Sequence, residues 1–320
     1  MNQCVSDLAS RGKRALMEIF RNLRKIGFVD TSVFFKIFDT QIQPILLYGA
    51  EIWGVDRFEK IEQVHIMACK KFLNVGLQTP NAIVYGECGR YPLHVNAMCR
   101  SVKYWLKLIE MDEDRIPRKS YNLLVYNDKC GRHNYASSIR SILFSHGFGV
   151  VWLSQAVGDK PSFMNSFKNV LINMFYQSWN STIKASSRYI LYKEFKSLLE
   201  PEKYLSIITE IKYRNVLIRL RAGLLRLKVN EGRWADIDLR LRLCPICETS
   251  IENEYHFTLE CEYYNDIRHL YLPTTFCNNP NMHKFKTLLS SSCKQLLGKL
   301  CKYLYYSYER RRNYEKPVNL

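Results

Sequence analysis

Apolar positions near the start of the chain recur at the three- and four-residue intervals of a helix. The series comprises Ala15, Leu16, Ile19, Phe20, Leu23 and Ile26, with Arg14, Arg21, Arg24 and Lys25 between them. A period near 3.6 residues places these apolar side chains on one face of an α-helix. Gly27 is expected to end this helix, and Thr31 or Ser32 to cap the next one.

Helical patterns continue through most of the chain. The run 34–47 is apolar and is interrupted by Pro44, and a second periodic run covers 58–73. In the middle of the chain, an amphipathic stripe comprises Phe163, Phe167, Val170, Leu171, Met174, Phe175 and Trp179. We interpret this stripe as part of a core, with a binding surface as the alternative.

Residues 211–229 carry the clearest helical pattern, with two apolar faces. One face comprises Tyr213, Leu217, Leu220, Leu224 and Leu227, and the other comprises Ile211, Ile218 and Leu225. Two apolar faces predict a helix that lies between two neighbours. The basic side chains between the faces are expected to pack their stems and to extend their charged heads outward.

These patterns predict a mainly α fold with a small cysteine- and histidine-containing element. Four segments are expected: helices in 1–75, a helical connector in 76–205, a basic helix followed by the small element in 206–272, and a basic, aromatic tail in 273–320. No segment resembles a secretory signal, and the longest uncharged stretch, 141–158, barely reaches the length of a membrane span. We therefore expect no membrane partner.

The chemistry of the chain is concentrated in one cluster, Cys-x2-Cys-x8-His-x4-Cys. It consists of Cys244, Cys247, His256 and Cys261. Three sulfurs and one imidazole nitrogen fill a tetrahedral Zn²⁺ shell without an open position, which is the arrangement of structural zinc. The alternative is a chance grouping, since the chain has eleven cysteines. The cluster predicts one structural Zn²⁺. Because a metal-type grouping is not a disulfide framework, it also predicts a reducing, intracellular compartment, either nucleus or cytoplasm.

Charge suggests the class of partner. The formal net charge of +17 attracts polyanions, so RNA or DNA is the first partner to consider, although charge can also serve solubility alone. Residues 212–242 contain nine basic and three acidic side chains, whereas residues 244–263 contain five acidic and no basic ones. An element that grips phosphate should be basic. The Cys/His element is therefore expected to be a structural staple packed against the basic helix.

The tail interleaves tyrosines with arginines. The segment 303–312 contains four tyrosines and ends in Arg310, Arg311 and Arg312. Such a pattern can stack on bases and contact phosphates. An amphipathic helix with a solvated basic end has the same appearance, and both interpretations remain open.

Several motifs together resemble the C-terminal part of the reverse transcriptases of LINE-type, non-LTR retrotransposons. The first is Tyr48-Gly-Ala-Glu-Ile-Trp53-Gly54, which is similar to a motif in the thumb region of that family. It is followed by Gly147-Phe-Gly-Val-Val-Trp152, by Arg221-Ala-Gly-Leu-Leu-Arg226, and then directly by the Cys/His cluster. The resemblance covers most of residues 10–270. It implies that 1–75 is thumb-like, that the cluster is a zinc knuckle, and that the region grips template RNA and target DNA.

Polymerase chemistry is not expected of this chain. Phosphoryl transfer on two Mg²⁺ ions needs paired aspartates, and no Asp-Asp pair occurs in the sequence. By the resemblance, the polymerase core would precede Met1, and the sixty or so residues after the knuckle are too few for a nuclease domain. We expect no enzymatic activity.

The sequence therefore predicts a nucleic-acid-binding remnant of a retrotransposon reverse transcriptase. The predicted contacts to nucleic acid are Arg214, Arg221, Arg226, Arg233, Arg310, Arg311 and Arg312. The alternative is a zinc-stabilised protein-interaction or structural module without a nucleic-acid role. Arginines paired internally with the five glutamates of the knuckle would favour this alternative.

Overall fold

The computed structural model describes residues 2–314, apart from the side chain of Ser187. The last six residues of the predicted tail segment, 315–320, lie outside the described residues. The structure is 71% helical, and the described residues contain isolated β-bridges but no strand. The predicted mainly α fold is confirmed.

The chain divides into two compact units, each assembled from separate stretches. Within the described residues, unit 1 comprises 2–24, 35–68 and 91–179, and unit 2 comprises 25–34, 69–90 and 180–314. The chain passes between the units within α1 (Asn2–Ile26), α2 (Thr31–Ile37), α5 (Glu59–Leu73) and α11 (Lys160–Ala185), and once more between residues 90 and 91. The four contiguous segments expected from the sequence stay a prediction.

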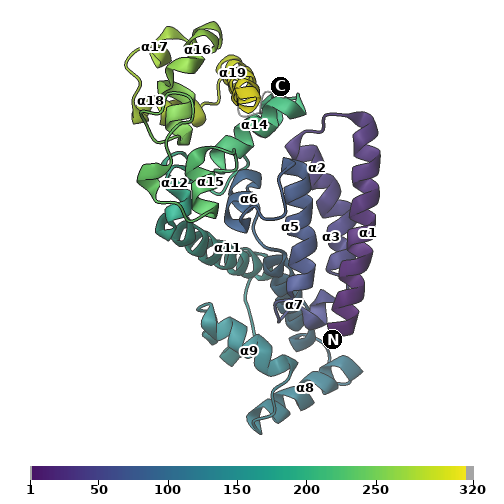
Figure 1. Ribbon diagram of the computed structural model, residues 1–320. Coiled ribbons are helices and arrows are strands. Elements are labelled where there is room, and N and C mark those ends of the chain that lie inside the picture. The colour runs from purple at the N-terminus through teal and green to yellow at the C-terminus, as the bar shows by residue number, and fades with distance from the viewer. Residues whose placement is uncertain (1, 315–320) are drawn as a thin grey trace. The chain divides into compact units, whose positions relative to one another are not determined.

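Unit 1 is built on α7 and the helices that follow it (Figure 1). Its further elements are the π-helix η1 (Phe38–Ile42), α3 (Gln43–Leu46), α4 (Ala50–Trp53), α7 (Leu93–Ile109), α8 (Ile116–Lys129), α9 (Tyr135–Ser145) and α10 (Gly149–Ser154). Trp105 and Trp152 stack at 5.9 Å between ring centroids, and the Trp105 indole donates to the Tyr121 hydroxyl at 2.9 Å. Phe167 and Leu171 are buried in the same core, whereas Met174 is exposed, so the core interpretation of the aromatic stripe is confirmed except at Met174.

Close approach of two helices in unit 1 depends on a glycine. A Cβ at Gly54, just after α4, would lie 2.4 Å from the carbonyl oxygen of Ala97 in α7. The Ser101 hydroxyl of α7 donates to the Ala50 carbonyl at 2.7 Å across the same interface. The Tyr-Gly-x-Glu-x-Trp-Gly motif therefore has a packing role, because its last glycine lets α4 lie directly on α7.

Unit 2 carries the Cys/His cluster. Its further elements are α6 (Asn81–Cys88), η2 (Ser187–Tyr189), α12 (Tyr192–Phe195), α13 (Tyr204–Ile207), α14 (Ile211–Arg221), α15 (Lys228–Trp234), η3 (Leu239–Leu241), η4 (His256–Glu260), η5 (Glu262–Tyr264), α16 (Asn265–Tyr271), α17 (Thr274–Cys277), α18 (Met282–Leu289) and α19 (Lys294–Tyr314). The last helix, α19, packs on both α14 and α16 (Figure 1). Its buried side chains include Leu300, Tyr303 and Leu304.

The single helix expected over 211–229 is wrong in its extent. The helix α14 ends at Arg221, and Gly223 adopts the left-handed conformation with φ +62°. The Leu224 amide then donates to the Arg219 carbonyl at 2.7 Å, which closes the helix as a left-handed glycine commonly does. A second helix, α15, starts at Lys228.

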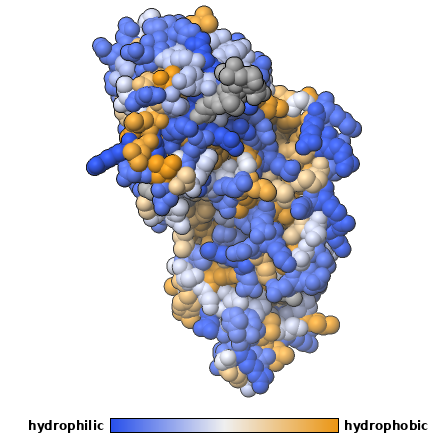
Figure 2. Space-filling model, viewed as in Figure 1, coloured by the Kyte–Doolittle hydropathy of each residue, from blue (hydrophilic) through white to orange (hydrophobic). Residues whose placement is uncertain are grey.

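On the face shown in Figure 2, hydrophobic side chains lie among more numerous hydrophilic ones. None of the helices in the described part of the chain is both long and apolar enough to span a membrane.

Candidate metal centre

The first two cysteines lie in a tight turn closed by a pair of extended residues. Leu243 and Ile251 form an antiparallel bridge, and the Cys244 amide donates to the Ser250 carbonyl at 2.8 Å. Within this turn, the Glu248 amide donates to the Cys244 carbonyl at 2.9 Å. Glu248 has a φ of +57°, in the left-handed region that residues other than glycine rarely adopt. This conformation reverses the direction of the chain tightly. The turn brings the Cys244 and Cys247 side chains to one side.

The third and fourth residues of the cluster are brought together by a π-turn. The Asn253 side chain accepts a hydrogen bond from the His256 amide at 2.8 Å and so caps this short helix. The Cys261 amide donates to the His256 carbonyl at 2.9 Å, an i to i+5 connection. In a regular α-helix, residues five apart differ by about 140° in direction. The wider turn is what lets His256 and Cys261 face the same point.

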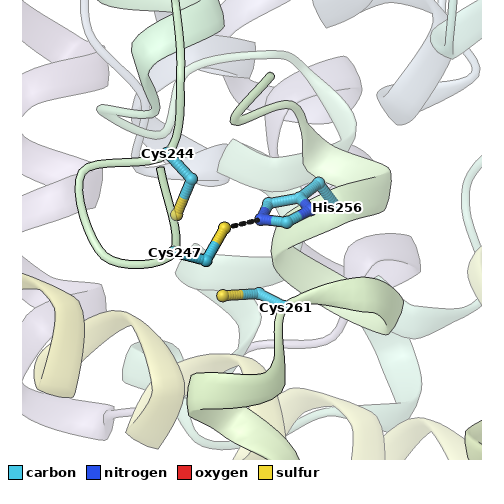
Figure 3. Close-up of side chains that lie close together, drawn as sticks. All are labelled: Cys244, Cys247, His256 and Cys261. Carbon is cyan, nitrogen blue, oxygen red and sulfur yellow. Dashed lines mark hydrogen bonds between the residues drawn. The ribbon is translucent and has the colours of Figure 1, made fainter. Parts of the chain in front are cut away.

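The four side chains converge on one point (Figure 3). The ligand atoms of Cys244, Cys247, His256 and Cys261 all lie within 4.8 Å of one another, and His256 Nε2 is 3.4 Å from Cys247 Sγ. Cys244, His256 and Cys261 are buried, and Cys247 is half-buried. These are the four residues predicted from the sequence, and together they can hold one metal ion.

Backbone amides near each sulfur act to lower the pKa of its thiol. They belong to Cys247 and Ile246 at Cys244, to Thr249 at Cys247 and to Tyr263 at Cys261. Such amide donors stabilise negative charge on sulfur, and the thiolate is the form that binds a metal. The backbone around the cluster is therefore arranged for thiolates.

Protonation is distributed unevenly over the four groups. Hydrogen bonds from the Cys261 thiol and from His256 outweigh burial and lower the pKa of Cys244 to about 3. The same hydrogen bond, with the protonated donor on Cys261, raises the pKa of Cys261. Burial opposes charge on His256, but Cys244 and Cys247 raise its pKa to about 9. A metal ion must displace these protons, so its binding should release protons and weaken in acid.

The second nitrogen of His256 is oriented as in metal-binding histidines. While Nε2 faces the sulfurs, Nδ1 is buried without a hydrogen-bond partner among the described residues, and Glu260 Oε2 lies 3.4 Å from it. A metal-binding imidazole commonly donates its remaining N–H to a carboxylate, which fixes the ring orientation. Glu260 is placed for that role.

The Cys/His turn is fastened to the rest of unit 2 by buried charges. Glu252, on the strand-like segment after the turn, accepts from Arg311 Nε at 2.5 Å and from the Lys228 amide at 2.7 Å. Arg268 donates to the carbonyl oxygens of Cys261 at 2.8 Å and Thr258 at 3.1 Å. The cluster is thus tied to α15, α16 and α19.

Three of the predicted nucleic-acid contacts are buried, contrary to the expectation that their heads extend outward. The Arg214 guanidinium lies against the Phe72 ring and donates to the Leu205 carbonyl at 3.2 Å. Arg221 is paired with Glu87, and Arg311 with Glu252. In unit 2, these groups neutralise buried carboxylates or pack against apolar side chains, so they are not available to a phosphate.

The other four predicted contacts are more accessible. Arg310 pairs with Asp266 at 2.6 Å and Arg312 with Glu309 at 2.8 Å, both on the surface. Arg226 is exposed, and Arg233 is half-buried with a hydrogen bond to Asn230 at 3.3 Å. The first two have carboxylate partners that a phosphate would have to displace.

Sequence reasoning missed a cationic groove between α7 and α11 in unit 1. The groove has a volume of about 640 Å³, and its basic lining residues are Arg100, Lys103, Lys107, Lys160 and Lys168. Its lining contains no carboxylate. The spacings 100, 103 and 107 on one helix and 160 and 168 on the other place these charges on single faces. That periodicity was available in the sequence, but it does not show that the two faces meet.

No family model, curated protein or solved structure matches this chain. The resemblance to LINE-type reverse transcriptases therefore rests on the motifs quoted above, and the chemistry of the site must be argued from its own residues.

Proposed function

We propose that this chain binds nucleic acid along the groove between α7 and α11 and that its Cys/His cluster holds one structural Zn²⁺. The motif resemblance to the C-terminal region of LINE-type reverse transcriptases supports the same class of partner. The proposal includes no enzymatic step, because the sequence has no aspartate pair for metal-dependent phosphoryl transfer.

Zinc is the metal that best suits the donor set. Soft thiolates select zinc, copper(I) or iron–sulfur clusters, and a tetrahedral site of sulfur and nitrogen donors favours zinc. With Cys244, Cys247, Cys261 and His256 all as ligands, a four-coordinate ion has no open position for a substrate. The proposed role is structural.

The observation that carries nucleic-acid binding is the charge of the groove. Lys103 and Lys107 are exposed, and no carboxylate of the described residues lies within ion-pair distance of either. Lys168 lies 5.9 Å from the centroid of the Tyr91 ring, and Lys160 is the one lysine here with a carboxylate partner, Glu110. Like charges gathered on two facing helices repel each other, and a polyanion relieves that repulsion.

The composition of the groove lining also suits a nucleic-acid strand. Leu106 and Met164 add apolar surface to the lining, while Asn96 and Asn165 add amide groups. Arg100 is fixed in place, because one of its guanidinium nitrogens donates to the Leu47 carbonyl at 2.9 Å. Phosphates on the lysines and sugar or base faces on the apolar side chains would satisfy both kinds of surface.

A second candidate, a zinc-stabilised interaction or structural module, is supported by one specific observation. Arg311 and Glu252 form a fully buried ion pair between α19 and the Cys/His element. Such internal pairing of an arginine with a glutamate of the Cys/His element is what a structural staple requires. A structural role explains the buried ion pair of unit 2, but it gives no role to the positive charge of the groove in unit 1.

The test is a salt titration of binding to single-stranded RNA and single-stranded DNA. We would compare the wild type with the triple variant Lys103→Gln, Lys107→Gln and Lys168→Gln. For single strands, each lost phosphate contact lowers the slope of log K against log salt by about 0.7, so the triple variant should lower it by about two. Affinity should fall equally for all sequences, because phosphate contacts carry no base information.

A matched control has the same change of net charge outside the groove. The triple variant Lys13→Gln, Lys36→Gln and Lys129→Gln removes three exposed lysines of the same unit. It should keep the wild-type slope. If both triple variants change the slope equally, the groove is not the site. If the wild type does not bind RNA or DNA at any salt concentration, the structural module becomes the leading function.

A further inference from the structure

Unit 2 contains a second cationic cavity, separate in composition from the groove of unit 1. It has a volume of about 430 Å³ and lies among η2, the end of α14, α15 and the segment that follows the Cys/His turn. Arg188, Arg233 and Arg242 all line it. The sequence had singled out only Arg233 of these three, as a nucleic-acid contact.

The cavity has more positive than negative charge. Its one lining carboxylate is Glu254, which is buried and already accepts a hydrogen bond from Asn230 at 2.9 Å. The Arg221 side chain also reaches the lining, but its guanidinium is neutralised by Glu87 and Glu202. The three other arginines therefore share a single nearby carboxylate.

The electrostatics of Arg233 reflect this crowding. Burial lowers the pKa of Arg233, Glu254 raises it, and the charges of Arg188 and Arg242 lower it further. The net shift of the pKa is downward, so the charged form of Arg233 is less favourable here than in water. An anion bound among the three guanidinium groups would stabilise the charged form.

One of the arginines is held rigidly at the wall. The Arg242 stem packs where Gly232 has no side chain, since a Cβ there would lie 2.6 Å from Arg242. Its guanidinium donates to the carbonyl oxygens of Ile237 and Val229. By contrast, Arg233 has one hydrogen bond, to Asn230, and Arg188 forms no ion pair with the described residues. Arg188 and Arg233 thus have free donors for a ligand.

The remaining walls are apolar. Tyr189, Leu239 and Ile251 line the cavity beside the arginines. Guanidinium forks match the geometry of phosphate oxygens, and an apolar or aromatic wall suits the face of a planar ring. We propose that this cavity binds the phosphate monoester of a nucleotide, with the phosphate on Arg188 and Arg233 and the nucleoside against the apolar walls.

The ligand has two possible sources with the same chemistry: a free mononucleotide or the phosphorylated end of a strand. Calorimetric titrations would use AMP, adenosine and inorganic phosphate. A second arm would compare a short oligonucleotide with and without a 5′-phosphate. We expect AMP to bind at least about tenfold more tightly than adenosine, because charge-assisted hydrogen bonds to the phosphate are lost in adenosine. A preference for the 5′-phosphorylated oligonucleotide would identify the strand end as the source, and its absence would identify the free nucleotide.

Variants locate the site. Arg188→Gln and Arg233→Gln should each weaken AMP binding about tenfold or more. Leu239→Glu, at a partly exposed lining position, should abolish it by placing a carboxylate at the cavity. Arg240→Gln is the matched control, because Arg240 is exposed in the same segment and does not line the cavity. It should bind AMP as the wild type does.

Two results would overturn the inference: equal affinity for AMP and adenosine, or equal loss in Arg233→Gln and Arg240→Gln. Equal affinity for AMP and inorganic phosphate would remove the nucleoside from the assignment. The groove variants of unit 1 should leave AMP binding unchanged. The failure of one proposal is therefore distinguishable from the failure of the other.

Discussion

At the scale of single residues, burial decides what a charge does. Arg221 and Glu87 are both fully buried, with a guanidinium nitrogen 3.0 Å from a carboxylate oxygen, and the Tyr204 hydroxyl also donates to Glu87 at 2.6 Å. Burial opposes the charge on Arg221, but the carboxylates of Glu87 and Glu202 outweigh it and raise its pKa. Removing one partner of such a pair leaves an uncompensated charge in the interior.

We therefore predict that Arg221→Gln lowers the free energy of unfolding by about 3–5 kcal/mol. Arg226→Gln, five residues away at an exposed position, should change it by less than about 0.5 kcal/mol. Urea unfolding followed by circular dichroism measures both. Equal effects of the two substitutions would contradict the buried pair.

A half-buried histidine, His94, should make unit 1 sensitive to acid. Burial and the charges of Arg57 and His146 lower the pKa of His94 to about 4, although Glu62 opposes the shift. The unfolded chain takes up this proton near pH 6.5, whereas the folded chain resists it until about pH 4. Stability from this group is thus present above pH 6.5 and is lost as the pH falls towards 4.

Between pH 7 and pH 4, the wild type should lose roughly 3 kcal/mol more stability than His94→Gln, since one pKa unit corresponds to about 1.4 kcal/mol. Denaturant midpoints at several pH values give this difference directly. His283→Gln, an exposed histidine of α18, is the control and should follow the wild type. Parallel pH profiles for the wild type and His94→Gln would show that His94 titrates normally.

The conformation of Glu248 gives a prediction for the metal turn. A non-glycine residue in the left-handed region is strained by about 1 kcal/mol, and Glu248 is exposed there with φ +57°. Glu248→Gly should raise the free energy of unfolding by up to about 1 kcal/mol, whereas Glu248→Ala, which keeps a Cβ, should not. Thermal unfolding of the metal-loaded protein distinguishes them. Equal stability of the two variants would mean that the turn is relaxed.

At the scale of elements, local sequence patterns predicted that a helix is present better than they predicted where it begins and ends. The first helix ends at Ile26, just before Gly27 with φ +88°, as the glycine predicted. The cap of the next helix is Asp30, whose side chain accepts from the Ser32 amide at 2.8 Å, and not Thr31 or Ser32. All three residue types can cap a helix, so the sequence alone could not select among them.

The break after α14 shows why the helix over 211–229 and the position of its basic side chains were predicted wrongly. The apolar periodicity continues past Arg221, so the sequence indicated one helix over 211–229, but Gly223 turns the chain. The buried partner of Arg221, Glu87, is 134 residues away in the sequence. Apolar periodicity shows which face of a helix is buried. It does not show that a carboxylate far away in the sequence, such as Glu87, pairs with an arginine of that helix in the interior. The four cluster residues were predictable because their chemistry is local in sequence.

At the scale of the whole molecule, the two units differ in how their basic side chains are paired with carboxylates. In unit 2, the acidic residues Glu252 and Glu254 near the cluster are buried, and Glu252 is paired with a basic side chain. In unit 1, the groove between α7 and α11 keeps several cations without carboxylate partners. We therefore propose that a metal ion stabilises unit 2 and that the groove of unit 1 binds the polyanion.

If the cluster binds zinc, the metal contributes directly to the folding of unit 2. Glu252, after the turn that holds Cys244, is hydrogen-bonded to α15 and α19, and Arg268 of α16 is hydrogen-bonded to the Cys261 carbonyl, so metal loss should loosen these three helices. Binding free energy at a site that is absent in the unfolded chain becomes folding free energy. Chelation should therefore lower the thermal midpoint of unit 2.

The most direct test of this account is native mass spectrometry of the tag-free protein. We predict that the wild type carries a mass increment of one zinc ion, that Cys247→Ser loses it, and that Cys293→Ser, at an exposed cysteine outside the cluster, retains it. A wild type purified without chelator that holds no metal, or a Cys247→Ser variant that keeps its full zinc content, would contradict the central claim.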